Sequence, residues 1–483
     1  MKKIPITIAC LSLTTISIMA QHPKTDHPNI ILCMGDDHAL EAISCYDSYL
    51  KDFAKTPNID QITKEGLLFN NCFCNNSICS PSRASIITGQ YSHKNGVLNL
   101  GGAINDDSPY FSVELQKAGY QTCIIGKWHL ATWPRGFDKY WIVKGQGTYF
   151  DPVFFTTPED KGIFKKGYAT DVYTDLAIDW LKNRDVDKPF LLCLYFKGPH
   201  HPYDYPERNA DILEGVMVPE PSNLYEDLNK TDSRLKSSYS SRLTNGGKRS
   251  YFLRHLNDTI PPMGKYEPND IISETSAAYQ HMMHKYIRCI TANDQNVGRI
   301  LDYTKQAGLD DNTVVIYTSD QGYWLGQHGF YDKRLILEES LKMPFLIRYP
   351  KIIKPGSRNN DFIMNIDFGP TLLDLAGVTI PESMQGKSFV PLLKGKKVKD
   401  FRDEVFYCYW ASPPHWGLRT ERYKLIHFPG TDEVEFYDLK NDPHEMHNLA
   451  MDPHYQKEIR ETQAKLDEVI KEIDIQNLPK PRK

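Results

Sequence analysis

The sequence predicts an α/β protein with a large, mostly parallel β-sheet sandwiched by helices and a smaller C-terminal antiparallel α+β domain. Short apolar runs alternate with helical patterns over the first three-quarters of the chain, polar side chains follow those runs, and the later strand patterns lack intervening helices. With 483 residues, 40% hydrophobic and 24% charged, and a net charge of −4, the composition is that of a globular protein. This charge gives no argument for a nucleic-acid partner, and no interior run reaches the ~20 apolar residues of a transmembrane helix.

Five apolar runs bounded by polar turns are the predicted strands of the large sheet. They are Ile30–Met34, Cys123–Ile125, Phe190–Phe196, Val314–Thr318 and Pro344–Tyr349. The helical patterns between them are Pro57–Gly66, Val113–Gly119, Thr174–Asn183 and Tyr279–Gly308. Continuous apolar strands that alternate with helices favour a parallel sheet covered on both faces.

After Asp367 the strand patterns follow one another without helices, which favours a separate antiparallel unit. The predicted strands and the amphipathic helix that ends this unit are Glu404–Tyr409, Tyr423–Phe428, Val434–Asp438 and Tyr455–Ile473. We place the boundary near Gly377–Gln385, which gives a main domain over residues 24–377 and a smaller one over residues 378–483.

Two segments differ from this core pattern. Residues 205–276 are polar and rich in Ser, Asn, Lys and Arg, and such an insertion is either disordered or a functional loop. At the N-terminus, Lys2 and Lys3 precede an apolar run, which predicts a signal peptide over residues 1–20 and a periplasmic or secreted protein. Cys10 lies too early and lacks a convincing lipobox, so attachment as a lipoprotein is the less favoured alternative.

Carboxylates follow two of the predicted strands. Asp36 and Asp37 come after the first strand, and Asp320 and Gln321 come after the fourth. Functional groups in such a sheet collect at the carboxyl ends of strands. A single Asp pair is more often a solvated turn, but two such groups offer hard oxygen ligands suited to Ca²⁺ or Mg²⁺ rather than to zinc.

The segment Cys79-Ser80-Pro81-Ser82-Arg83 combines a nucleophile-sized side chain with an arginine that can bind an oxyanion. Residues 84–89 are predicted to form a short helix whose N-terminal amides would favour an anion. Taken alone, the segment fits equally well a loop with a buried cysteine and an exposed arginine.

Two longer motifs resolve this ambiguity. Ser77–Gly89 contains C-x-P-S-R…T-G, and Gly119–His129 contains G-Y-x-T…G-K-W-H. Together they resemble the type I, formylglycine-dependent sulfatases of the alkaline phosphatase-like superfamily. The resemblance also includes Asn29–Asp37, Lys197–His200, Thr318–Gly322, Lys333 and Gly417–Ile426.

The resemblance implies an alkaline phosphatase-like fold and a modified nucleophile. In that family a sulfatase-maturating, formylglycine-generating enzyme oxidises the motif cysteine, here Cys79, to formylglycine. The hydrated aldehyde attacks sulfur, holds a sulfo-enzyme and then expels sulfate through its second hydroxyl. The family pattern also places one Ca²⁺ per chain on Asp36, Asp37, Asp320 and Gln321, with the modified Cys79 completing the shell. Gln321 departs from the Asn or His that many members carry.

The same resemblance gives roles to the cationic and imidazole residues. Arg83 and Lys127 match positions that hold the diol and the sulfate, and Lys333 matches the second sulfate-binding lysine. His129 matches the residue that takes a proton from the diol. His200, with Lys333, matches the group that assists the departing alcohol as general acid. Asp320 is a further candidate proton acceptor, and His328 is a candidate to line the substrate subsite.

These implications lead to a predicted function. We expect an exported, Ca²⁺-dependent sulfatase that acts on a sulfated carbohydrate, and residues 319–334 look most like N-acetylglucosamine-6-sulfatases of glycosaminoglycan degradation. The expected partners are this substrate and the maturating enzyme. Two alternatives stay open: a phosphonate monoester or phosphodiester hydrolase on the same scaffold, and a sugar-binding pseudoenzyme with an unmodified Cys79.

Overall fold

The computed structural model describes residues 27–226, 242–244, 246–254, 267–399, 401–429 and 433–479. The predicted signal peptide over residues 1–20 and much of the polar insertion lie outside these ranges. No helix within them combines the length and the apolar character needed to span a bilayer.

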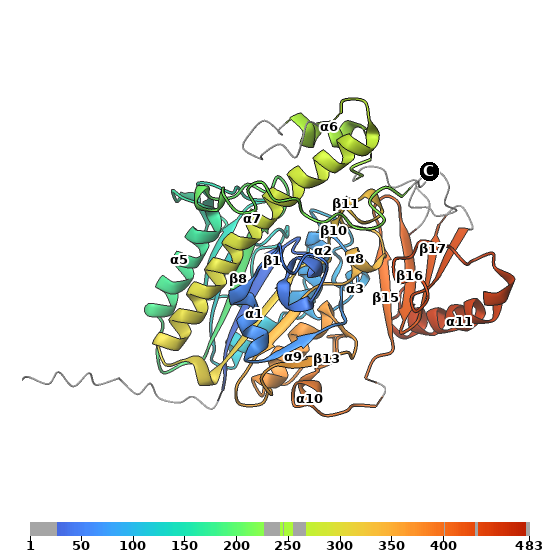
Figure 1. The fold of residues 1–483 in the computed structure, drawn as a ribbon. Helices are drawn as coiled ribbons and strands as arrows, with labels where there is room; N and C mark the ends of the chain where they lie inside the picture. Colours follow the sequence, from blue (N-terminus) through green and yellow to red (C-terminus); the bar gives the residue numbers. More distant parts are fainter. Residues whose placement is uncertain are drawn as a thin grey trace, which may run out of the picture.

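The molecule is built on a ten-stranded sheet (Figure 1) whose five central strands are parallel. Their order across the sheet is β9 (Thr313–Ser319), β1 (Asn29–Asp36), β8 (Phe190–Pro199), β4 (Gln121–Lys127) and β5 (Lys139–Val143). β1, β8 and β9 are buried along their whole length, as expected for strands covered on both faces. The predicted parallel core is therefore confirmed.

The two margins of the sheet contain antiparallel pairs. On one side the order continues through β12 (Phe345–Arg348), β2 (Leu67–Phe69) and the edge strand β13 (Ser357–Asn359), and β12 is antiparallel to both of its neighbours. On the other side follow β6 (Val153–Phe155) and β7 (Ile163–Phe164), which are antiparallel. The fifth predicted strand thus exists but is reversed, because no covering helix carries the chain back across the sheet between β9 and β12.

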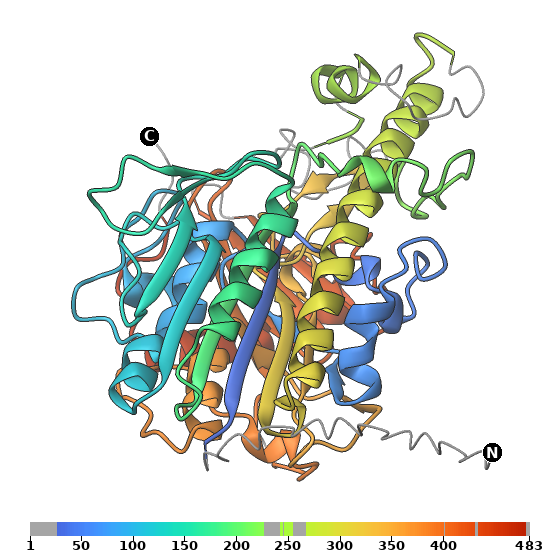
Figure 2. The same ribbon diagram turned by 90° about the vertical axis from the view of Figure 1, so that its left-hand side faces the viewer.

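Helices cover both faces of the sheet. Figure 2 shows α5 (Ala169–Lys182) and the long α7 (Ile271–Gln306) side by side across one face, and α1 (Pro57–Lys64) packs into the same apolar cluster. The opposite face is covered by α2 (Cys79–Thr88), α4 (Phe111–Lys117) and α9 (Phe368–Leu375). α7 begins earlier than predicted, where the Asp270 side chain accepts from the amide of Ile272 at 3.1 Å and caps the helix.

Short elements complete this part of the chain. They are β3 (Cys72–Phe73) paired with β14 (Ile363–Met364), β10 (Trp324–Leu325) paired with β11 (Tyr331–Asp332), and the helices α3 (Ser92–Asn95), α6 (Gly246–Arg254), α8 (Glu338–Leu341) and α10 (Val390–Leu393). The described helical parts of the polar insertion are the 3₁₀ turn Glu207–Asn209, α6 and the first turns of α7.

The C-terminal sheet is an antiparallel meander of β15 (Glu404–Tyr409), β16 (His415–Thr420), β17 (Tyr423–Phe428) and β18 (Glu433–Asp438), followed by α11 (Gln456–Glu472). Sequence analysis predicted all of these except β16. Its Gly417 packs so tightly that an added Cβ would lie 2.1 Å from the carbonyl oxygen of Leu425. A glycine weakens the strand signal in a sequence and at the same time permits this close approach.

One apolar cluster connects the C-terminal sheet with the main sheet. It contains β1 and α2 residues such as Leu32 and Ile86 together with Val405, Leu425 and Leu466 from the C-terminal elements. The two units therefore share a core, and a division between residues 377 and 378 stays a prediction.

Candidate active site

The carboxyl ends of four neighbouring strands form the candidate site. β9, β1, β8 and β4 are adjacent and parallel, so the polar residues that end or follow them lie at one edge of the sheet. The backbone amide of Asp37 donates to Asp320 Oδ1 at 3.1 Å, and Lys127 forms an ion pair with Asp36. Segments far apart in the sequence are thereby brought together, as the sequence predicts.

Three buried carboxylates alternate with three buried cations in this cluster. Arg83 Nε donates to Asp320 Oδ2 at 3.0 Å, and Arg83 Nη2 lies 3.4 Å from Asp36 Oδ1. Lys333 Nζ donates to both oxygens of Asp37 at 2.7 and 2.6 Å. Burial raises the pKa of Asp36, but Lys127, His200 and Arg83 more than offset it and hold that pKa well below its usual range.

The same carboxylates can hold a hard divalent cation. Oxygens of Asp36, Asp37 and Asp320 lie within 4.8 Å of one another, and all three residues are buried. Gln321 donates through Nε2 to Asp37, while its Oε1 is buried with no hydrogen-bond partner among the described residues. Burial, opposed by Lys333 and reinforced by Asp36 and Asp320, raises the pKa of Asp37 to about 7. This donor set and its crowded charge fit Ca²⁺ or Mg²⁺.

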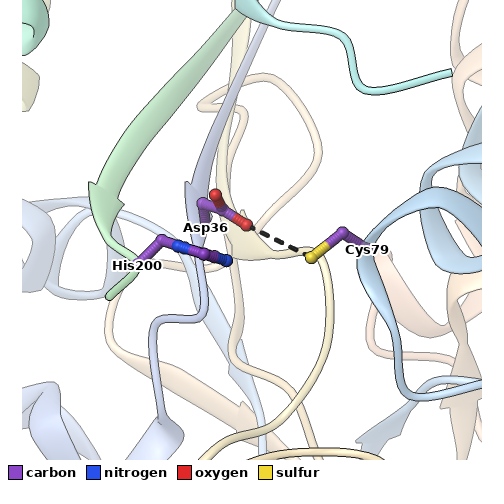
Figure 3. A group of neighbouring side chains, drawn as sticks. All are labelled: Asp36, Cys79 and His200. Carbon is purple, nitrogen blue, oxygen red and sulfur yellow. Dashed lines mark hydrogen bonds between the residues drawn. The ribbon is translucent and has the colours of Figure 1, made fainter. Parts of the chain in front are cut away.

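Cys79 is the first residue of α2 and faces the carboxylates. Figure 3 shows its sulfur pointing toward Asp36 from the helix start, with His200 on the other side, and Sγ lies 3.7 Å from Asp36 Oδ1. The prediction of a loop through Arg83 and a helix from Ala84 is wrong, since the helix already begins at Cys79. Pro81 lies in the first turn, where the missing amide breaks no helical hydrogen bond.

Burial also determines the chemistry of the unmodified thiol. Cys79 is 1% exposed, and burial, opposed by Lys127 and Lys333, raises the pKa of its thiol to about 12. Because the thiolate is the nucleophilic form, an unmodified Cys79 would be protonated and inert at neutral pH.

Two of the three predicted site histidines, His129 and His200, lie at this edge of the sheet. His200 Nε2 is 3.6 Å from Asp37 Oδ2, and Nδ1 donates to the carbonyl of His201 at 2.7 Å. Burial and the charge of Lys127 lower the pKa of His200 well below its usual range. His129 has a left-handed backbone (φ +56°), and burial with the charges of Lys127 and Arg83 lowers its pKa to about 3. The carbonyl of His129 accepts from Ser80 Oγ at 2.7 Å, which ties this residue to the start of α2.

His328, the remaining histidine candidate, lies elsewhere in the core. Its side chain is fully buried and paired with Glu226 through Nδ1. No hydrogen bond or ion pair among the described residues joins it to the carboxylate cluster. Its proposed place in the substrate subsite stays a prediction without structural support.

The structure adds residues to which sequence reasoning gave no role. Lys127 Nζ also donates to Gln146 Oε1 at 2.5 Å, and the hydroxyl of Tyr149 donates to the carbonyl of His200. Lys197 is 2% exposed and its Nζ lies 4.8 Å from the centre of the Tyr149 ring, with no carboxylate in ion-pair range among the described residues. In the sequence, the one signal that Lys197 belongs to the site was its position at the end of an apolar run.

Comparison with known proteins decides the family. A family model for sulfatases matches residues 28–378. The chain belongs to the sulfatase family. A second model, for the C-terminal region of N-sulphoglucosamine sulphohydrolase, matches residues 326–472 of this sulfatase. The enzyme is therefore a sulfuric ester hydrolase.

Individual relatives extend the likeness over almost the whole sulfatase. It is 39% identical to an N-acetylglucosamine-6-O-sulfatase of Bacteroides thetaiotaomicron, over 97% of this chain and 90% of the relative. A solved structure of a protein in complex with its substrate, D-glucosamine-2-N,6-O-disulfate, matches with a TM-score of 0.87 at 38% identity, covering 94% of this chain and 99% of the other. A phosphonate monoester hydrolase of Silicibacter pomeroyi matches with a TM-score of 0.72 at 21% identity, covering 92% of this chain and 95% of the other, and shares the alkaline phosphatase-like fold.

Proposed function

We propose that this sulfatase hydrolyses a sulfate ester of a glucosamine-type sugar, such as N-acetylglucosamine-6-O-sulfate, with a formylglycine formed from Cys79. The proposal for the substrate is carried by the 39% identity to an N-acetylglucosamine-6-O-sulfatase over nearly the full length. The match to a structure that holds a sulfated glucosamine supports the same sugar class.

The proposal for the nucleophile rests on the position of Cys79. The side chain lies at the carboxylate cluster but is buried as a protonated thiol, so it needs activation or modification to react. Oxidation to formylglycine by a maturating enzyme removes this problem, because the hydrated aldehyde supplies a hydroxyl nucleophile that does not depend on the thiolate. We assign this modification to Cys79.

The surrounding cations suit the charge that develops during sulfate transfer. Arg83 is held by Asp36 and Asp320, Lys127 by Asp36, and Lys333 by Asp37, so all three are fixed before substrate arrives. Preorganised positive groups in a buried site stabilise a transition state with anionic oxygens far better than solvent does. We propose that these three residues bind the sulfate group.

Proton transfer is assigned to the groups nearest the scissile bond. His200 Nε2 and Lys333 Nζ both lie at Asp37 Oδ2, at 3.6 and 2.6 Å. Because Nδ1 of His200 donates to a carbonyl, a proton that Nε2 gives to the departing alcohol has to be a second proton on the ring. We propose that His200 and Lys333 assist the leaving oxygen and that His129 accepts a proton from the nucleophile. Asp36, Asp37, Asp320, Gln321 and the modified Cys79 would hold Ca²⁺, which supplies fixed positive charge next to the sulfate.

Export is part of the proposal. The apolar run after Lys2 and Lys3 would direct the chain to the periplasm or the medium. Mass spectrometry of the mature protein, purified from the periplasm or medium of a bacterial host, would locate the signal-peptide cleavage site.

Two measurements test the function. Mass spectrometry of the peptide that contains Cys79, from protein co-produced with a maturating enzyme, should show formylglycine. Sulfate release should be measured on N-acetylglucosamine-6-O-sulfate, on its 3-O-sulfate isomer and on an aryl phosphonate. We expect turnover of the 6-O-sulfate and its loss in Cys79→Ala, with Cys123→Ala as a control at another buried cysteine. An intact Cys79 thiol in active protein would contradict the formylglycine mechanism. Faster turnover of the phosphonate than of the sugar sulfates would contradict the proposed action on sulfated sugars.

A further inference from the structure

A cavity of about 800 Å³ lies at the open edge of the ten-stranded sheet, apart from the carboxylate cluster. Its walls are the edge strand β13, Leu67 of β2, the end of α10 and the loop from Lys394 to Lys399. Figure 1 shows β13 and α10 together at the bottom of the molecule, away from β10 and β11 at the top. In the sheet order, β13 is four strands from β1, a separation of roughly 19 Å at the usual strand spacing.

The rim of this cavity is strongly basic. Among the described residues, its charged lining consists of Lys354, Arg358, Lys394, Lys396, Lys397, Lys399 and the carboxylate of Asp361. Arg358 pairs with Asp47 at 2.9 Å, whereas Lys354, Lys394, Lys396 and Lys397 have no carboxylate within 4.0 Å among the described residues. The whole chain carries a net charge of −4, so this positive field is a local feature and not a result of composition.

The floor of the cavity is apolar. Leu67, Leu392 and Leu393 are buried there, and Ile352 is half-buried beside them. Asn359 and Asn360 add amide groups at the wall, and in the part of the chain that the structure describes β13 pairs with β2 and with no other strand. Aliphatic surface suits the C–H faces of sugar rings, and a rim of ammonium groups suits sulfate or carboxylate substituents.

We propose that this cavity, named here the edge pocket, is a second binding site for a sulfated glycan chain. Closely spaced lysines such as Lys396, Lys397 and Lys399 are typical of heparin-type patches. The inference rests on the proposed action on sulfated sugars, because the same anionic chain would then be both ligand and substrate. A chain held at the edge pocket raises the effective concentration of its sugars at the catalytic site.

A simpler explanation of the lysines makes a different prediction. Basic side chains beside an edge strand prevent pairing with other proteins and need bind nothing. In that case, removing the charges would leave glycan binding unchanged and would promote association of the protein with itself.

The test compares two triple variants with the same loss of charge. Lys394→Ser, Lys396→Ser and Lys397→Ser are combined to alter the edge pocket, and Lys161→Ser, Lys166→Ser and Lys182→Ser form the control at exposed positions elsewhere. Both are compared with wild type on N-acetylglucosamine-6-O-sulfate and on a heparin octasaccharide. We expect KM for the octasaccharide to rise at least about tenfold in the edge-pocket variant alone, a modest part of the 10²–10⁴ that a second site can contribute. Rates on the monosaccharide should be unchanged in both variants.

Direct binding separates this inference from the proposed function. Calorimetry with Cys79→Ala protein, which cannot hydrolyse the substrate, should show binding of the octasaccharide. This binding should weaken when the three edge-pocket lysines are also replaced. If octasaccharide binding depends on these lysines but the wild-type protein desulfates no sugar, the second binding site is supported and the proposed function is contradicted. Equal binding by all variants, or equally tight lysine-dependent binding of duplex DNA, would overturn the inference and leave the function standing.

Discussion

The Gln321 side chain touches the carboxylate cluster through its amide nitrogen, which donates to Asp37, while its Oε1 is buried without a described partner. A bound cation would satisfy this oxygen. We therefore expect Gln321→Leu to raise the Ca²⁺ concentration needed for half-maximal activity by at least about 10–100-fold, which is the loss already seen when a residue that only supports metal ligands is removed. Calcium titration after chelator treatment measures this shift. Gln321→Asn keeps the carbonyl and is the matched control, and equal calcium dependence in the Leu variant would show that Gln321 is no ligand.

His328 provides a prediction about pH. Burial lowers its pKa, but the hydrogen bond that Nδ1 donates to Glu226 and the charges of Glu339, Glu226 and Glu445 outweigh burial and raise the pKa above its usual value. A pKa that is raised in the folded state stabilises the protein below the unfolded-state value and loses this contribution as the pH rises through the folded-state value. Wild-type stability should therefore fall more steeply above pH 6.5 than that of His328→Gln, measured by chemical unfolding from pH 6 to pH 9. If the free energy of unfolding of the two proteins changed with pH in the same way, the ion pair between His328 and Glu226 would be contradicted.

At the scale of elements, β15 connects two segments of the active site through one hydroxyl. Tyr407 of β15 accepts from the amide of Ser77, two residues before Cys79, at 3.2 Å and donates to the carbonyl of Arg334, directly after Lys333. Ser340 supports the same junction, since its Oγ accepts from the Arg334 amide at 2.9 Å. The C-terminal sheet thus positions both the proposed nucleophile and the lysine opposite it.

Loss of this hydroxyl should affect both stability and catalysis. In Tyr407→Phe a buried amide and a buried carbonyl lose their partner, which costs about 1–3 kcal/mol of the free energy of unfolding. We also expect kcat to fall by up to about 100-fold through displacement of the reacting groups, with calcium dependence retained. Tyr423→Phe, on β17, is the control. A stability loss with unchanged kcat would limit Tyr407 to a structural role.

The long buried elements were predictable, whereas short strands of the main sheet such as β2, β5 and β13 were not predicted. Long apolar runs such as Phe190–Phe196 identify buried strands regardless of context. β16 was missed because Gly417 weakens its strand pattern, and the start of α2 was missed because Pro81 suggests a turn. The direction of β12 depends on how the chain returns after β9, which periodicity does not encode.

At the scale of the whole molecule, the shared apolar cluster should make the two sheets unfold together. β15 to β18 and α11 contribute buried side chains such as Tyr407, Leu425 and Leu466 to the same core as α2 and α4. We expect one calorimetric transition for the full chain. A chain that ends at residue 399 would expose this apolar surface and should aggregate. Two separate transitions, or a soluble and cooperatively folded truncated chain, would indicate independent domains.

The candidate site was predictable because its residues follow strands that end at one edge of the sheet. Asp36, Lys127, His200 and Asp320 could be grouped for that reason before any contact was known. The supporting contacts could not be inferred, since each depends on packing between distant segments. Tyr407 meets Ser77 across 330 positions of sequence, and His328 meets Glu226 across 102.

The assembly of the site from distant strands also imposes an order during synthesis. Cys79 leaves the ribosome early, whereas Asp320 and Lys333, which help to enclose it, emerge only after β9 has been made. At 5–20 residues per second this delay lasts about 10–50 seconds. Until those segments fold around it, the thiol, which is 1% exposed in the finished fold, is not yet enclosed by them. An enzyme that oxidises Cys79 would therefore act on the growing or still unfolded chain, and its access would end when the last strands close over the cysteine.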